Sequence, residues 1–219
     1  MPEDMWDWLN GPVADDIERL NRASQMNVVA GLVRSLLAQQ QRLGQQQRHG
    51  RPPIPDESAL RLLHRTATVF LLAKPGQYRN FDVHVDTAGI VAFRGQPWRS
   101  IKRLMRRFFR DLEARWKTGD AVDVASYALW RLTWIHPFSN GNGRTAIAFA
   151  YACLCLKLGA WLPGKETIVD LITADPERCQ DVLRTTDRGM ARPTDEPDLG
   201  AIKAYLDDLL LRQMRTLEA

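Results

Sequence analysis

Cysteine and histidine are scarce in this chain, which has three cysteines and four histidines among 219 residues. Cys153 and Cys155 stand two positions apart within an apolar helical pattern, so their side chains point to different faces. Three cysteines cannot all pair, and we expect reduced structural thiols rather than a disulfide scaffold. No histidine stands at a zinc-finger spacing from a cysteine pair, which argues against a structural zinc site.

Long apolar runs and a secretory leader are also missing. The longest apolar stretch, at about residues 146–156, is ended by Lys157 and Gly159, well short of the roughly 20 residues that a bilayer span needs. The first residues are acidic and show no basic flank followed by an apolar stretch, so no secretory signal is readable. We therefore expect no membrane association and a cytoplasmic protein.

Neither basic nor acidic residues are in large excess. Lys and Arg number 30, Asp and Glu number 26, and the net charge is +4 with a pI of about 9.1. This balance bears on solubility and a weak attraction for anions, not on a specific partner. The composition, 45% hydrophobic and 26% charged, is that of a globular protein and excludes collagen-like and disordered chains. The length suits one domain with extensions.

The order of patterns along the chain predicts three parts. Residues 1–50 contain apolar positions at helical spacing followed by a glutamine-rich tract, and the prolines after Gly50 predict a linker at about 48–56. We expect an N-terminal helical extension at 1–50, a central domain at 51–192, and a C-terminal helix at 193–219 that packs on the domain. Apolar spacing, caps and breaks predict further helices at about 56–71, 100–116, 122–135, 145–158 and 175–183.

One segment changes its hydrophobic period. Phe81, Val83 and Val85 alternate with polar residues, and the residues at 86–89 offer a turn before a second apolar run at 90–93. This alternation predicts a short β-hairpin, which must pack on helices because an isolated hairpin is marginally stable. The expected fold class is therefore all-α, mainly a helical bundle, with one short β-hairpin.

The segment richest in chemical information is residues 135–145, Ile-His-Pro-Phe-Ser-Asn-Gly-Asn-Gly-Arg-Thr, between two predicted helices. Gly141 and Gly143, placed just before a helix, allow a ligand to approach the backbone and allow free amides to point at an anion such as phosphate. Arg144 adds a guanidinium suited to phosphate oxygens, although a cation opposes the helix dipole there. His136 titrates near neutrality and is a candidate general base.

Each of these pieces also has a plain structural interpretation. A Gly-Asn-Gly loop is common between helices, and a histidine before proline is often a helix-end residue. Together, a base, a glycine loop, a helix start and an arginine within nine residues indicate a phosphate-handling site. The basic residues of 102–115 suggest a nucleic-acid interface more weakly, because the apolar face of that helix suits a bundle surface. We do not expect nucleic acid to bind.

The same segment resembles the signature of the Fic family (Fic/Doc, or Fido, fold), H-P-F-x-(D/E)-G-N-G-R-x-x-R. Seven positions are in register: His136, Pro137, Phe138, Gly141, Asn142, Gly143 and Arg144. Residues 75–79 are similar to the stretch that precedes the family's hairpin. The predicted hairpin, at about 82–94, stands where Fic proteins carry a flap that holds a strand of the target protein. The resemblance covers roughly residues 56–190.

The resemblance implies transfer of AMP from ATP, with Mg²⁺, onto a serine, threonine or tyrosine of a target protein. His136 would deprotonate the target hydroxyl, and Phe138 would anchor the loop in the bundle. The resemblance further implies a target strand along the flap, a small antitoxin as a regulatory partner, and a bacterial toxin or an effector delivered to another cell. The residues expected to hold the phosphates are Gly141, Asn142, Gly143 and Arg144.

Two positions depart from the signature. Asn140 stands where the family has an acidic residue that binds Mg²⁺, so any metal there is expected to bind weakly. Ile147 replaces the final arginine, which in the family contacts the nucleotide and pairs with an inhibitory glutamate. Three functions stay open: an adenylyltransferase, a transferase that uses another nucleotide-linked donor, and a degenerate fold that binds nucleotides or protein partners.

Overall fold

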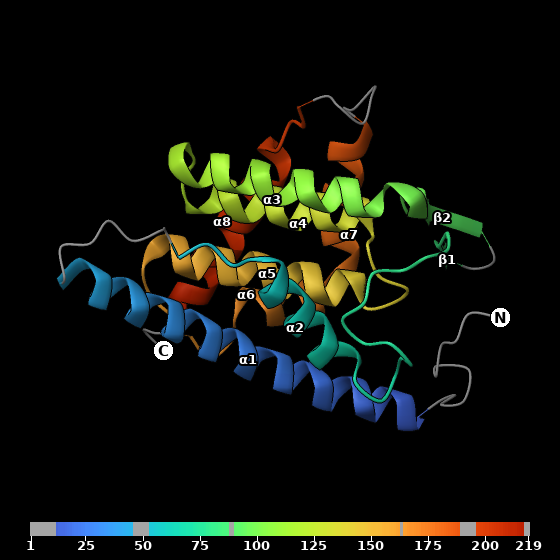
Figure 1. Ribbon diagram of the computed structural model, residues 1–219, viewed down its shortest axis with the longest axis horizontal. Coiled ribbons are helices and arrows are strands. Elements are labelled where there is room, and N and C mark those ends of the chain that lie inside the picture. Colours follow the sequence, from blue (N-terminus) through green and yellow to red (C-terminus); the bar gives the residue numbers. More distant parts are fainter. Residues whose placement is uncertain (1–11, 46–52, 88–89, 163, 189–195, 217–219) are drawn as a thin grey trace.

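The computed structural model describes residues 12–45, 53–87, 90–162, 164–188 and 196–216 (Figure 1). These residues form a helical bundle with one two-stranded antiparallel hairpin, which confirms the predicted fold class. The elements are α1 (Pro12–Gln45), α2 (Glu57–Thr68), β1 (His84–Thr87), β2 (Ile90–Arg94), the 3-10 turn η2 (Trp98–Ser100), α3 (Ile101–Thr118), α4 (Ala121–Ile135), α5 (Asn142–Leu158), α6 (Ile168–Ala174), α7 (Pro176–Arg188) and α8 (Gly200–Arg215).

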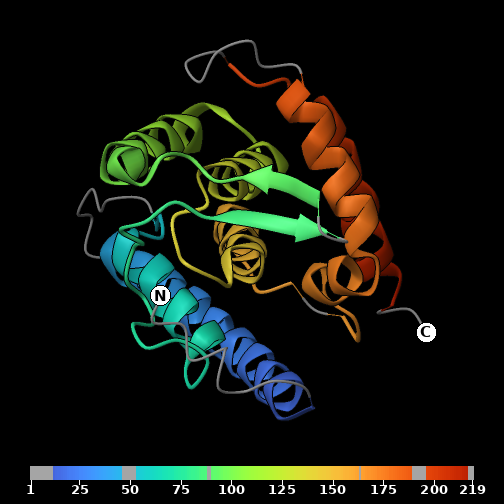
Figure 2. The same cartoon turned by 90° about the vertical axis from the view of Figure 1, so that its right-hand side faces the viewer.

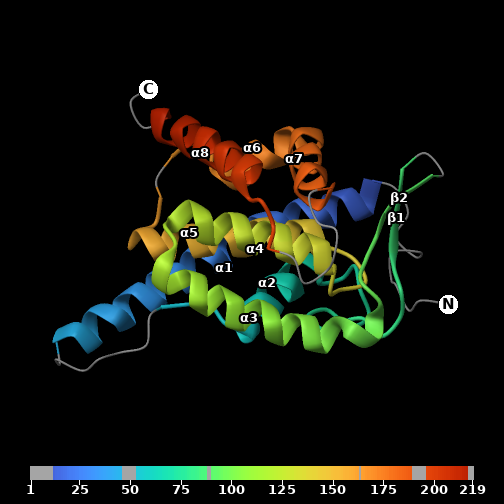
Figure 3. The same cartoon turned by 90° about the horizontal axis from the view of Figure 1, so that it is seen from above.

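Helix α5 lies in the centre of the bundle. Its sequence is apolar nearly all round, as expected for a buried helix, and Ala146, Ala148, Phe149 and Cys153 are fully buried. It packs against α4 on one side and against α1 and α2 on the other (Figures 1 and 3). The three cysteines are free and buried, in agreement with the predicted reduced thiols.

Helix α1 runs along one side of the bundle and shares its core. Val29 and Val33 are fully buried. The Asn21 amide donates to the Val69 carbonyl over 2.8 Å, and the Gln25 amide donates to the Leu63 carbonyl over 3.0 Å, so buried polar groups fix α1 against the α2 segment. The predicted divisions at 50/51 and 192/193 remain predictions, and both fall outside the described residues.

The helix boundaries follow local chemistry. Asp56 caps α2 and Asp120 caps α4, each accepting a hydrogen bond from a backbone amide three residues on. The predicted end of α2 near residue 71 is wrong, because the helix ends at Thr68 and Phe70 has a positive φ of 63°. The short helix α6 was not predicted, since seven residues give little periodicity.

The hairpin projects from the bundle beside the start of α3 (Figures 1 and 3). Its register pairs His84 with Arg94 and Val85 with Phe93, and it shifts between Val85 and Asp86. The chain before β1 and the chain after β2 stay together, because the Gly95 amide donates to the Val83 carbonyl over 3.0 Å. Among the described residues, no helix is long and apolar enough to cross a membrane.

Candidate functional site

The loop between α4 and α5 takes its shape from two left-handed residues. His136 ends α4 with φ 55°, and Gly141 precedes α5 with φ 68°. A Cβ at Gly141 would lie 2.6 Å from the Thr68 Cγ2 atom, so only glycine fits both this conformation and this space. Helix α5 begins at Asn142, three residues before its predicted start at Thr145.

The side chain of Asn142 closes the loop. Its Oδ1 atom accepts a hydrogen bond from the Phe138 amide, and its Nδ2 atom donates to the Phe138 carbonyl, both over 2.9 Å. Asn142 is 4% exposed, so these hydrogen bonds are shielded from water. The asparagine of the Gly-Asn-Gly sequence is therefore a structural clasp, while its backbone amide belongs to the first turn of α5.

Phe138 is buried, as an anchor of the loop should be, and it stacks on His64 with ring centroids 3.7 Å apart. The Gly76 amide donates to His64 Nδ1 over 2.8 Å, so Nε2 must carry the proton that is shared with the Asn140 carbonyl over 3.0 Å. Burial lowers the pKa of His64 to about 4. Sequence reasoning missed this residue, because a lone histidine in an amphipathic helix gives no specific signal.

Three amides in the first turn of α5 are open. No acceptor among the described residues pairs with the backbone nitrogens of Asn142, Gly143 and Arg144. Gly143 is exposed, and a Cβ there would meet nothing within 4 Å. The Gly141 amide differs, since it donates to Asn140 Oδ1 over 2.5 Å. The open amides and the helix dipole make this turn suitable for an anion.

Arg144 joins this turn to the N-terminal helix. Its Nη1 atom lies 2.9 Å from Oε1 of Glu18, on α1, and 3.3 Å from the carbonyl oxygen of Ala67. Burial lowers the pKa of the guanidinium, and the charge of Glu18 opposes this effect. Sequence reasoning did not pair Glu18 with Arg144, because nothing in the sequence links residues 126 positions apart.

His136 is half-buried at the other end of the loop. Its Nδ1 atom lies 3.0 Å from the Thr133 carbonyl oxygen, which can only accept, so Nδ1 carries the proton and Nε2 has a free lone pair. Burial lowers the pKa of His136, the hydrogen bond to Thr133 opposes this, and the charge of Arg79 lowers the pKa further. The ring also contacts Phe93 of β2, at 5.1 Å between centroids.

Arg79 holds the loop against the base of the hairpin. Its buried guanidinium donates to the His136 carbonyl and to the Phe81 carbonyl, each over 2.7 Å, and also to the Gln96 carbonyl. Its backbone amide donates to the Pro137 carbonyl over 3.0 Å. Arg79 thereby positions the histidine. The sequence indicated the resemblance of residues 75–79 to the family but predicted no separate role for Arg79.

The residues present do not make a resident metal site. Asn140 brings no charge, and its side-chain oxygen already accepts the Gly141 amide. In the described part of the chain, no group of three or more His, Cys, Asp or Glu residues could hold a metal ion. Ile147 packs half-buried against the core at the position of the missing arginine, so no cation stands there.

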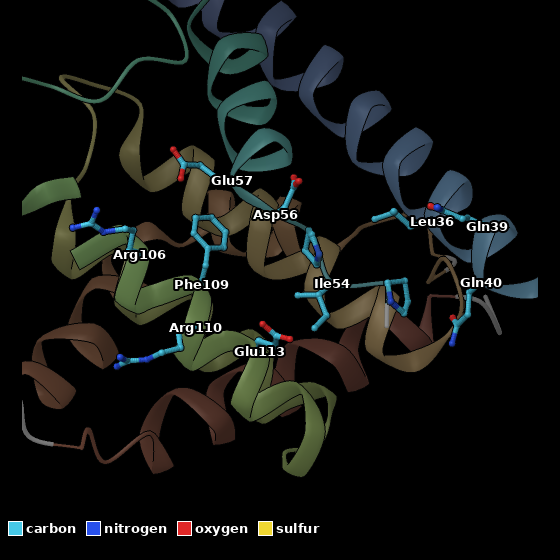
Figure 4. Close-up of a pocket in the computed structure, with 12 residues that line it drawn as sticks. Leu36, Gln39, Gln40, Ile54, Asp56, Glu57, Arg106, Phe109, Arg110 and Glu113 are labelled. Carbon is cyan, nitrogen blue, oxygen red and sulfur yellow. The ribbon is translucent and has the colours of Figure 1, made fainter. Parts of the chain in front are cut away.

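Two hollows are prominent on the described surface. One, of about 680 Å³, adjoins the loop through Ser139 and Arg79. The other, of about 610 Å³, lies between the C-terminal half of α1 and α3 (Figure 4). None of the predicted site residues lines the hollow of Figure 4, so it is separate from the loop.

The sequence was compared with protein families, and one family matches the region that contains the loop. Residues 54–154, which include α2, the hairpin, α3, α4 and most of α5, match the Fic/DOC family. Residues 54–154 belong to the Fic/DOC family. The predicted resemblance is thus confirmed, and the matched region contains the whole loop with His136 and Arg144. Fic/DOC proteins are generally transferases, so the family match supports a Fic-type transferase function in general.

Solved structures share the Fic fold over most of this chain. A Fic domain containing signaling protein from Bacteroides thetaiotaomicron has a TM-score of 0.66 at 20% identity, covering 94% of this chain and 72% of that one. A Fic family protein from Desulfovibrio desulfuricans has a TM-score of 0.57 at 18% identity, covering 92% and 67%. Fic-1 from C. elegans has a TM-score of 0.61 at 16% identity, covering 95% of this chain and 54% of that structure. No curated protein of matching sequence was found.

Proposed function

We propose that this Fic/DOC protein is a protein adenylyltransferase, which moves AMP from ATP onto a hydroxyl side chain of a target protein. One observation carries the proposal: a histidine with a free Nε2 lone pair and a turn with three open amides occupy opposite ends of one short loop. This combination supplies a base for an alcohol and a cradle for an anion, which are the two parts that phosphoryl transfer chiefly needs.

In the proposed reaction, Nε2 of His136 takes the proton of the target hydroxyl as its oxygen attacks the α-phosphorus of ATP. The bond between the α-phosphorus and the bridging oxygen of the β-phosphate breaks, and pyrophosphate leaves. The lowered pKa of His136 keeps the imidazole neutral at pH 7, so the base is in its accepting form. Two hydrogen bonds hold the ring in place: one from Nδ1 to the Thr133 carbonyl, and one from the Arg79 guanidinium to the His136 carbonyl.

The phosphates would occupy the N-terminus of α5. The amides of Asn142, Gly143 and Arg144 are the donors proposed to hold them, and the Arg144 guanidinium would neutralise the leaving pyrophosphate. Arg144 can do so only if its ion pair with Glu18 opens or is shared with the phosphate. Mg²⁺ supplies charge neutralisation to such a reaction when it is bound. Because Asn140 is a poor ligand, we propose that the ion arrives with the nucleotide.

The hairpin is the proposed docking edge for the target, whose backbone would pair with an exposed strand. A regulatory partner such as an antitoxin, action as a bacterial toxin or delivered effector, and a cytoplasmic location are further proposals that rest on the resemblance alone.

A second function has its own support. Asn140 removes a negative charge from the predicted metal position and Ile147 removes a positive charge from the nucleotide position. Both changes favour weaker catalysis, so a nucleotide-binding or protein-interaction module, or a transferase with another nucleotide-linked donor, is the alternative.

The deciding experiment is mass spectrometry of a cell lysate incubated with the protein, Mg²⁺ or Mn²⁺, and each of ATP, GTP, CTP and UTP. We expect an AMP adduct on a hydroxyl residue with the intact protein and none with His136→Ala. Thr185→Ala, on the exposed face of α7, is the matched control and keeps the adduct. An adduct from another nucleotide would establish the other donor. Nucleotide binding without any adduct would establish the binding module.

A further inference from the structure

The hollow beside the loop lies at the base of the hairpin. Figure 2 shows the chain that leads into β1 and the chain that follows β2 side by side, and the hollow is formed where these chains join the bundle. Its described lining comes from the segment after α2, from η2 and the start of α3, and from the loop between α4 and α5: Leu72, Ala73, Lys74, Gln77, Tyr78, Arg79, Asn80, Phe81, Trp98, Arg99, Ile101, Lys102 and Ser139.

The charge of this hollow has a single sign. Among the described residues that line it, four are cationic, namely Lys74, Arg79, Arg99 and Lys102, and none is acidic. Arg99 and Lys102 are exposed, and neither has an acidic partner in the described part of the chain. The Arg99 guanidinium rests over the Trp98 ring at 4.7 Å, which holds it at the rim.

One acid lies close to this hollow without lining it. Asp82 accepts the Trp98 amide over 2.8 Å and lies 3.8 Å from the buried Arg79 guanidinium, so it offsets the charge of Arg79 and leaves that of the exposed Arg99 and Lys102. The hollow of Figure 4 is a useful contrast, because its lining combines Arg106 and Arg110 with three acidic residues, Asp56, Glu57 and Glu113. The excess of positive charge is thus a property of the hollow beside the loop and not of every depression on a mildly basic protein.

We propose that this hollow binds an acidic stretch of the target polypeptide, next to the hydroxyl that is presented to His136. The inference rests on the proposed function, since it names the kind of protein that the transferase modifies. Ser139 and Arg79 connect the hollow to the histidine: Ser139 belongs to the same loop, and Arg79 binds the His136 carbonyl.

A polypeptide fits this place better than the nucleotide does. The residues proposed to hold the phosphates, Gly143 and Arg144, do not line the hollow, and Arg144 instead faces α1 and α2 through Glu18 and Ala67. A target strand that pairs with the hairpin would continue past its base, where the aromatic rings of Phe81 and Trp98 can pack on the stems of carboxylate side chains. Complementary charge there would favour targets with Asp or Glu beside the modified residue.

The test uses a short fluorescein-labelled peptide of glutamate, glycine and serine, and the same peptide with glutamine in place of glutamate. Binding to the full chain is measured by fluorescence anisotropy at low ionic strength. Arg99→Glu combined with Lys102→Glu is compared with Arg103→Glu combined with Lys117→Glu, which makes the same change of net charge on exposed positions of α3 outside the hollow. Two attractions become repulsions in the first variant, so we expect binding to weaken on the order of tenfold.

The control variant should weaken binding by less than about threefold, and added salt should weaken binding to the intact protein. The glutamine peptide should bind on the order of tenfold less tightly than the glutamate peptide. Equal binding of the two peptides, an equal loss in both variants, or displacement of the peptide by ATP would overturn the proposal.

His136→Ala separates this inference from the proposed function, because it should abolish transfer and leave peptide binding unchanged. If the intact protein modifies no target but binds the glutamate peptide through Arg99 and Lys102, only the transferase proposal fails. If it modifies a target and the Arg99 and Lys102 variant neither loses peptide binding nor slows that transfer, only the acidic-target inference fails.

Discussion

Arg144, in the first turn of α5, and Glu18, on α1, form an ion pair with 2.9 Å between Nη1 and Oε1. The two side chains are 16% and 28% exposed, so the pair is partly shielded from solvent. Its basic member belongs to the turn that carries the three open amides of α5, where we propose that a nucleotide phosphate binds. The N-terminal helix therefore places a negative charge against Arg144, and under this proposal Glu18 competes with phosphate for the guanidinium.

Replacing Glu18 should strengthen phosphate binding. We expect Glu18→Gln to lower the dissociation constant for ATP, or for pyrophosphate, by about threefold to tenfold, because Arg144 is released from a competing carboxylate. Isothermal titration calorimetry measures the change. Asp15→Asn, which removes an exposed charge one turn earlier on α1, is the control and should have little effect. Identical affinities for the two variants would mean that Arg144 does not meet the phosphates.

The rate of transfer should depend on the protonation of His136. Burial and the charge of Arg79 lower its pKa below the usual 6.5, so the neutral, proton-accepting imidazole persists into mildly acidic solution. We expect the rate to stay level near pH 7 and to fall on acidification with a midpoint below 6.5. Rates of transfer and NMR titration of the imidazole should give the same midpoint. A midpoint at or above 6.5 would contradict the assignment of His136 as a desolvated base.

His64 should make the folded protein sensitive to acid. Its pKa is about 4 in the folded protein and 6.5 when unfolded, so the unfolded chain binds more protons between these values. The stabilisation is complete above pH 6.5 and is lost as the pH falls toward 4, by about 3 kcal/mol in the free energy of unfolding. Urea denaturation at pH 7 and at pH 4 measures this loss. In His64→Phe, which keeps an aromatic ring against Phe138, this component of the pH dependence should disappear, although stability at pH 7 should also fall. An unchanged pH dependence would exclude His64 as its source.

A carboxylate at position 140 should recover metal binding. Asn140→Asp retains an oxygen that can accept the Gly141 amide and adds the charge that Mg²⁺ prefers. We expect the apparent affinity for Mn²⁺ in the presence of ATP to rise about tenfold, with a faster transfer reaction; the metal affinity is measured by electron paramagnetic resonance. Asn140→Ser keeps a small polar group without the charge and should show no such gain. If the two variants behave alike, the metal does not approach this position.

Several expectations came from local chemistry and held in the structure. The alternation at 81–85 predicted the hairpin. Capping patterns helped to predict helices near 56 and 122, and the structure assigns the caps to Asp56 and Asp120. The all-round apolar character of α5 placed it in the core. The expectations that failed depended on tertiary context. The end of α2 moved to Thr68 because the chain turns there through a positive φ at Phe70, and α5 gained a first turn because the Asn142 clasp folds the glycine loop into the helix.

The sequence by itself determined the helical class, the hairpin and the order of histidine, glycine loop and arginine, because periodicity, capping and backbone freedom act over a few residues. Only the tertiary structure decided what surrounds them: Glu18 against Arg144, His64 beneath Phe138, Arg79 behind His136, and one cationic hollow at the base of the hairpin. These contacts join residues up to 126 positions apart, and burial sets the protonation of both histidines. Such effects arise from packing between distant segments, which no local pattern encodes.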